Sequence, residues 1–160
     1  MYLYAKKGIA SIDYTTSKMG EFSKKLNPDY TILASLMGAT DWVTNPDSFA
    51  FAQVSLQVGY WRKANAIHNW FVQELADGED NCNPIYVPRS SLVDLNNICK
   101  EILKNHDKAG ELLPTGAGFF FGSTNYDEWY FHQLETTVPI LTKLIETVPE
   151  GWSFEYQASW

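Results

Sequence analysis

The strongest constraint on the fold of this chain is that its apolar residues change period, alternating in some segments and recurring at helical spacing in others. Alternation is clearest at the end of the chain, where every second residue is apolar: Trp152, Phe154, Tyr156, Ala158 and Trp160. Residues 50–60 alternate in the same way, and residues 1–12 do so more weakly. Because a period of two is typical of a half-buried strand, we expect strands near 1–12, 50–60 and 151–160, with a shorter candidate over 85–87.

Helical spacing of apolar residues predicts about three helices between these strands, over residues 61–76, 89–105 and 125–148. Pro88 precedes the second helix, where proline is tolerated, and Thr124-x-x-Asp127 resembles a capping box before the third. Pro139 is expected to kink or split that last helix. Strands near both ends and in the middle, with helices between them, predict an α+β fold in which the helices pack on one face of a small antiparallel or mixed sheet.

At 160 residues the chain is long enough to bury a core, and we expect a single domain spanning residues 1–160. Residues 13–49 show no clear period, and asparagine–proline–aspartate triplets at 27–29 and 45–47 predict turns there. A short helix from Tyr30 to Met37 is a candidate within this stretch. We therefore interpret residues 13–49 as a variable insertion or lid.

The net charge of −7 argues against one broad class of partner. An acidic protein repels the phosphate backbone, so binding to a nucleic-acid polymer is not expected. Arg62 and Arg89 are the only arginines, yet a small phosphorylated ligand needs few cations and stays compatible with this composition. No signal peptide and no apolar run of membrane length is recognisable, which predicts a cytoplasmic protein with no membrane partner.

Signals for catalysis or metal binding are weak. Cys82 and Cys99 have neither metal-ligand nor redox spacing, so we expect free thiols, with a disulfide between them as the alternative. His68, His106 and His132 lack paired zinc spacing. No nucleophile–base arrangement is recognisable, because catalytic triads are assembled in space rather than along the chain. We expect no metal, no cofactor and no catalytic residue.

Two dense blocks, residues 60–71 and 112–130, crowd aromatic, small and hydrogen-bonding residues together, which is typical of a pocket wall. An aromatic-rich core would explain them equally well. In the first block Trp61, Asn65 and His68 follow one another at helical spacing along the edge of the apolar stripe. They predict a site in which Asn65 and His68 hydrogen-bond a ligand and Trp61 stacks on its ring, with a structural role for His68 as the alternative. Trp70 falls on the polar side, which predicts a subunit or domain contact, the former as in a homo-oligomer, or a cover provided by residues 13–49.

Anion-binding groups come from several places in the chain. Arg62 or Arg89 could hold a phosphate or carboxylate with forked donors, although a solvated surface arginine is the alternative. The run Gly116-x-Gly118-x-x-x-Gly122-Ser123-Thr124 precedes a helix N-terminus, where unpaired N–H groups attract anions, but it is neither a P-loop nor a dinucleotide fingerprint. Its three phenylalanines could equally plug the core. The predicted ligand-binding residues are therefore Trp61, Arg62, Asn65, His68, Arg89, Thr115, Ser123, Thr124 and Tyr126.

Several segments also carry a resemblance: residues 1–7, YWRKANAIHNWFV at 60–72, Asp77-Gly78 with Asn81-Cys82, and the run from Leu113-Pro114-Thr115 through FFFGST at 119–124 to YDEWY at 126–130. Together they resemble a family of small proteins encoded by tailed bacteriophages and prophages. Members typically begin Met-Gly-Leu-Asp-Met-Tyr-Leu, and this chain starts at the Met-Tyr-Leu. The resemblance leaves out residues 13–49. Short phage proteins of this kind often act against host defence, and one class sequesters nucleotide second messengers.

The resemblance and the pocket pattern together predict a non-enzymatic phage protein that sequesters a nucleotide-like small molecule in the host cell cytoplasm, with a host immune second messenger as one candidate ligand. One alternative is a protein-interaction inhibitor of a host defence enzyme, with Trp70 and residues 13–49 at the contact. The other alternative is an enzyme that cleaves a nucleotide or nucleotide sugar, with His68 as the acid or base.

Overall fold

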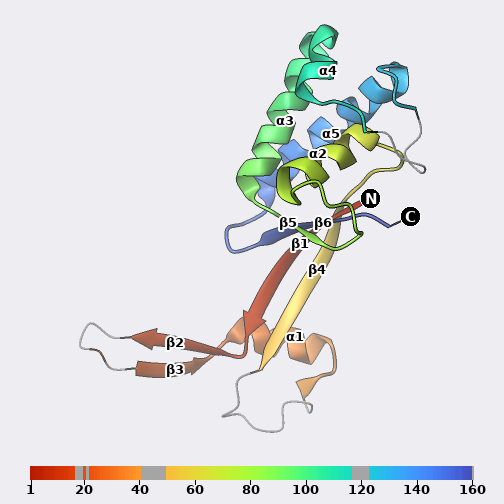
Figure 1. Ribbon diagram of the computed structural model, residues 1–160. Coiled ribbons are helices and arrows are strands. Elements are labelled where there is room, and N and C mark those ends of the chain that lie inside the picture. Colours follow the sequence, from red (N-terminus) through yellow and green to blue (C-terminus); the bar gives the residue numbers. More distant parts are fainter. Residues whose placement is uncertain (17–19, 21, 41–49, 117–122, 160) are drawn as a thin grey trace. The chain divides into compact units, whose positions relative to one another are not determined.

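The computed structural model describes residues 1–16, 20, 22–40, 50–116 and 123–159 (Figure 1). Its strands are β1 (Tyr2–Ala10), β2 (Ile12–Thr16), β3 (Phe22–Leu26), β4 (Phe51–Tyr60), β5 (Ile85–Val87) and β6 (Ser153–Gln157). Its helices are α1 (Pro28–Leu36), α2 (Asn65–Leu75), α3 (Arg89–Lys104), α4 (Ala109–Leu112) and α5 (Glu128–Thr147). The α+β fold class predicted from the sequence is confirmed.

The chain divides into two compact units, one formed by Met1–Lys6 with Leu56–Trp160 and the other by Lys7–Ser55. The long strands β1 and β4 contribute residues to both units. Residues 13–49 fall entirely within the second unit. That they serve as an insertion or lid on a single domain stays a prediction.

The second unit contains a hairpin that the sequence did not predict. β2 pairs with β3 in antiparallel register, with Ile12 opposite Leu26. The predicted strand over residues 1–12 is divided at Ser11, which separates β1 from β2. α1 follows directly, and the Asn27 side chain caps it by accepting a hydrogen bond from the Asp29 N–H at 2.9 Å. The turn expected at 27–29 is thus a helix start, whereas the one expected at 45–47 lies outside the described residues.

In the first unit the sheet order is β4-β1-β6-β5. β6 is antiparallel to both of its neighbours, so that Glu155 lies opposite Tyr4 of β1 and Tyr86 of β5. Met1 and Trp61 exchange both main-chain hydrogen bonds, at 3.2 and 3.0 Å, which joins the start of β1 to the end of β4. Such a reciprocal pair is typical of antiparallel strands. The alternating segment that ends the sequence is therefore a central strand.

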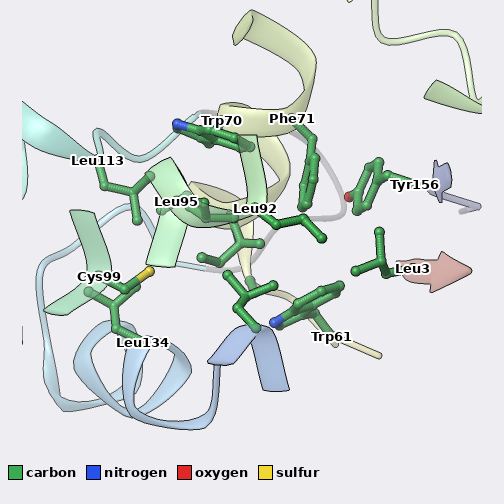
Figure 2. Close-up of a cluster of buried hydrophobic side chains, with 14 of the residues drawn as sticks. Leu3, Trp61, Trp70, Phe71, Leu92, Leu95, Cys99, Leu113, Leu134 and Tyr156 are labelled. Carbon is green, nitrogen blue, oxygen red and sulfur yellow. The ribbon is translucent and has the colours of Figure 1, made fainter. Parts of the chain in front are cut away.

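The core of this unit lies between the sheet and helices α2, α3 and α5, which gather on the same side of β5 and β6 (Figure 1). Figure 2 shows Leu3 and Tyr156 from the sheet facing Trp61 and the helical side chains. The Phe71 ring stacks on the Tyr156 ring with centroids 4.1 Å apart. Cys99 is buried in the same cluster as a free thiol, and its burial raises its pKa to about 12.

The helix ends differ from the sequence prediction in informative ways. α2 begins at Asn65 rather than near residue 61, because Lys63 adopts a left-handed backbone conformation with φ of 57°. α5 begins at Glu128, with Asp127 rather than Thr124 as its cap. α5 also continues through Pro139 as one helix. Across the described part of the chain, no helix is both long and apolar enough to cross a membrane.

Candidate ligand-binding site

The two dense blocks of the sequence meet in space. Asn65 Nδ2 donates to the Ser123 carbonyl at 2.6 Å, and Asn69 Nδ2 donates to the Pro114 carbonyl at 3.3 Å. Gly116 packs closely on α2, since a Cβ on it would lie 3.1 Å from Asn69. These contacts hold Pro114, Gly116 and Ser123 against the first half of α2. Residues 117–122, which include the three phenylalanines, lie outside the described residues.

A small hollow, which we call the α2 hollow, lies where the blocks meet. Residues 63–67 form one wall and residues 123–134 contribute the other, and the enclosed volume is about 20 Å³. That space holds one group the size of a water molecule. The N-termini of α2 and α5 both reach this hollow. Two helix dipoles therefore direct their positive ends toward it.

The two helix ends differ in their capping. At α5 the Asp127 carboxylate accepts from the Tyr130 N–H at 3.0 Å and offsets the positive end. At α2 the cap residue is Ala64, and among the described residues no side chain caps the first turn. The N–H groups that start α2 therefore lie at the hollow with no side-chain acceptor from the described part of the chain. Lys63, which is exposed, adds a positive charge beside them.

One exposed aromatic ring lines the hollow, and a second lies in the chain segment that forms its wall. Trp129 lines it and is 50% exposed, and Tyr126 is 42% exposed. Tyr126 meets the Tyr130 ring edge to face with centroids 5.0 Å apart. A large exposed aromatic is costly to leave in water and commonly marks a binding surface. Trp129 was not among the predicted site residues, although its position off the apolar stripe of the last helix was a usable signal.

Trp61 and His68 are located in the core. Trp61 is 2% exposed, and its Nε1–H donates to Thr137 Oγ1 of α5 at 2.8 Å. His68 is 4% exposed and lies 2.7 Å from the Tyr156 hydroxyl through Nδ1 and 3.2 Å from Asp80 Oδ2 through Nε2. Neither residue lines the α2 hollow. Trp70, expected on the exposed side of the helix, is only 9% exposed.

The remaining predicted residues are dispersed. Arg89 donates to four carbonyl oxygens at the C-terminal end of α5, so its guanidinium is already engaged. Thr115 Oγ1 donates to the Thr124 carbonyl at 2.9 Å. Arg62 is exposed and directly precedes Lys63. Of the predicted set, Asn65 and Ser123 line the hollow together.

The buried His68 has a defined tautomer. The Asp80 carboxylate only accepts hydrogen bonds, so His68 Nε2, which lies 3.2 Å from it, carries the imidazole proton and donates it. Nδ1 then accepts from the Tyr156 hydroxyl, which keeps its proton because burial raises its pKa well above the usual value. Burial lowers the pKa of His68, and the hydrogen bond and charge of Asp80 oppose that effect. This relay ties the segment after α2 to the central strand β6.

A pH dependence of stability follows from His68. Because its pKa is lower in the folded protein than the ordinary value of about 6.5 in an unfolded chain, the unfolded chain binds more protons as the pH falls through that value. We expect the free energy of unfolding to decrease below neutral pH until His68 is also protonated in the folded state. Urea unfolding at a series of pH values measures this, and His68→Gln should flatten the profile in that window. An unchanged profile in the variant would assign the dependence to other groups.

Metal ligation has no visible basis within the described ranges, where no group of three or more His, Cys, Asp or Glu side chains is arranged to hold an ion. Comparisons with protein-family models, with curated proteins and with solved structures found no match to this chain. The resemblance to phage proteins therefore stays a prediction from the sequence. The molecule is described by its own features, an α+β fold whose α2 hollow lies between two helix N-termini.

Proposed function

We propose that this protein binds, without altering it, a small molecule of nucleotide type, in which an aromatic ring is joined to an anionic group. The observation that carries the proposal is the α2 hollow, where an uncapped helix N-terminus opens beside Lys63 and the exposed ring of Trp129. An anion accepts from helix N-terminal N–H groups, and a base stacks on an aromatic face.

The size of the hollow limits how such a ligand would sit. About 20 Å³ admits a single small group, such as one phosphoryl oxygen, while the rest of the ligand lies along the rim. Asp127 also lines the hollow, but its carboxylate is engaged with the N-terminus of α5. Lys63, the neighbouring Arg62 and the α2 dipole would then hold the anionic group, with the ring against Trp129 or Tyr126.

Binding without chemistry is supported by the position of His68. This residue was the candidate acid or base, and it is buried between Tyr156 and Asp80, away from the hollow. A general acid or base must reach the proton that it transfers. In line with the resemblance to phage proteins, we further propose that the ligand is a host nucleotide signal, which the protein sequesters in the host cytoplasm.

Thermal unfolding in the presence of cyclic dinucleotides, ADP-ribose derivatives or NAD tests the proposal. A ligand at one hundred times its dissociation constant is expected to raise the unfolding free energy by about 2.7 kcal/mol. Trp129→Ala should remove a stacking contribution of about 1–3 kcal/mol. Lys63→Asn should weaken binding while keeping a residue that tolerates the left-handed backbone. Mass analysis of the released ligand should find it intact.

The controls separate binding from folding. Tyr14→Ala changes an exposed aromatic in the second unit and should leave both stability and ligand binding unchanged. The proposal is overturned if none of these compounds stabilises the protein at submillimolar concentration, or if Trp129→Ala and Lys63→Asn bind as well as the parent. Recovery of a cleaved ligand would instead support the enzyme alternative.

A further inference from the structure

A second concave surface, which we call the acidic groove, lies between α2, α3 and the segment around α4. It encloses about 420 Å³, and its apolar lining includes Leu75, Ile98 and Leu112. Three carboxylates border it, one from each helix: Glu74, Asp94 and Glu111. Among the described residues no lysine or arginine lines the groove. It therefore differs in both size and charge from the α2 hollow.

The acidic surface continues beyond Glu74 and Leu75, which also line a neighbouring hollow of about 560 Å³. That hollow adds Asp77 and Glu79 and likewise has no basic residue in its lining. Within the described ranges none of these carboxylates forms a salt bridge. The C-terminus of α2 lies at the same place, and its last turn carries no basic residue, so its dipole adds negative potential.

A hydrogen-bond donor opens into the acidic groove. Trp70 lines it and is nine-tenths buried, and its indole N–H has no acceptor in the part of the chain that the structure describes. Every fully buried side-chain polar atom in that part does have a partner, so the N–H must reach solvent. Figure 2 shows the Trp70 nitrogen at the end of the ring turned away from Phe71. An indole N–H only donates, so an occupant of the groove has to supply an acceptor.

We propose that the acidic groove binds a basic segment of a partner protein. Lysine or arginine side chains of that segment would pair with Glu74, Asp94 and Glu111, and their aliphatic stems would cover the apolar lining. A main-chain carbonyl of the segment accepts from the Trp70 indole. A polyamine has the charge but no acceptor, and a nucleotide phosphate is repelled by the carboxylates, so a peptide fits this combination best. The inference is independent of the small-molecule site, since the two occupy different ends of α2.

Fluorescence anisotropy with a labelled synthetic peptide of alternating lysine and leucine tests the proposal. We expect saturable binding that weakens as salt is raised, because complementary charges steer and hold the peptide. The triple variant Glu74→Gln, Asp94→Asn, Glu111→Gln should weaken binding at least about tenfold, which corresponds to about 1.4 kcal/mol. The matched control Glu135→Gln, Glu146→Gln, Glu150→Gln removes the same number of exposed charges outside the groove and should bind like the parent.

Trp70→Phe tests the indole donor, and its thermal unfolding shows whether the variant is folded. If Trp70→Phe fails to fold, competition by spermine decides the same point, because an acceptor-free polycation should displace the peptide only weakly. The proposal is overturned if both triple variants bind equally, if spermine competes as well as an unlabelled copy of the peptide, or if no saturable binding occurs at low salt. The proposal of a separate partner is also overturned if the protein alone self-associates and the groove triple variant abolishes that association. The occupant of the groove would then be a second copy of this chain.

Discussion

Trp61→Ala is expected to lower the free energy of unfolding by about 3–5 kcal/mol, the largest effect of any single substitution proposed for this protein. Trp61 is only 2% exposed and packs between the sheet and α5, so removal of the indole leaves a cavity in a close-packed core. The change also leaves Thr137 Oγ1 without its donor at 2.8 Å. Urea unfolding followed by circular dichroism measures the loss.

Trp129→Ala is the matched control, because it removes the same side chain from a half-exposed position at the rim of the α2 hollow. Its unfolding free energy should stay within about 0.5 kcal/mol of the parent, as is usual for surface substitutions. The pair thus separates a tryptophan that stabilises the fold from one available to a ligand. If Trp61→Ala had the same unfolding free energy as the parent, the structural role of Trp61 would be contradicted. If Trp129→Ala lowered that free energy more than Trp61→Ala, the roles of the two rings would be reversed.

Arg89→Met is expected to lower the unfolding free energy by about 2–3 kcal/mol, since hydrogen bonds to a charged group are among the strongest. The guanidinium donates to the carbonyl oxygens of Leu144, Ile145, Val148 and Pro149, at 3.4, 3.0, 2.7 and 3.2 Å. It therefore caps the C-terminus of α5 and offsets the negative end of its dipole. The guanidinium also lies over the Phe154 ring, 5.4 Å from its centroid. Methionine keeps much of the apolar stem and removes every donor.

Arg62→Met provides the comparison within the only two arginines of the chain. Arg62 is exposed, so its replacement should change the unfolding free energy by less than about 0.5 kcal/mol. Its effect should be seen instead in the affinity for an anionic ligand at the α2 hollow. If Arg62→Met and Arg89→Met lowered the unfolding free energy equally, the assignment of Arg89 as a stabilising cap of α5 would be contradicted.

Much of the fold could be predicted because period alone distinguishes a strand from a helix. The alternation from Trp152 onward predicted β6. The apolar spacing after Pro88 predicted α3 with an end one residue beyond the observed one. The hairpin of β2 and β3 was missed. Its strand Phe22–Leu26 carries two adjacent lysines and shows no clean alternation, so the pairing depends on β2 rather than on a local signal.

The candidate site, like the fold, was predicted only in part. Asn65 and Ser123 were predicted as site residues from two separate blocks, and in the structure Asn65 donates a hydrogen bond to the Ser123 carbonyl. Trp61 and His68 were placed on the same helix edge as Asn65, yet their partners Thr137 and Tyr156 come from α5 and β6. Helical spacing shows which side chains share a face. It does not show which other element covers that face.

The sequence by itself therefore determined the fold class and the main strands and helices, because these depend on local period and composition. Only the tertiary structure decided which polar groups are engaged in the core and which are left to a ligand. Arg89 became a helix cap and Trp70 the wall of an acidic groove because segments far apart in the chain pack beside them. Burial and hydrogen-bond partners are properties of that packing, and no single segment of the sequence carries them.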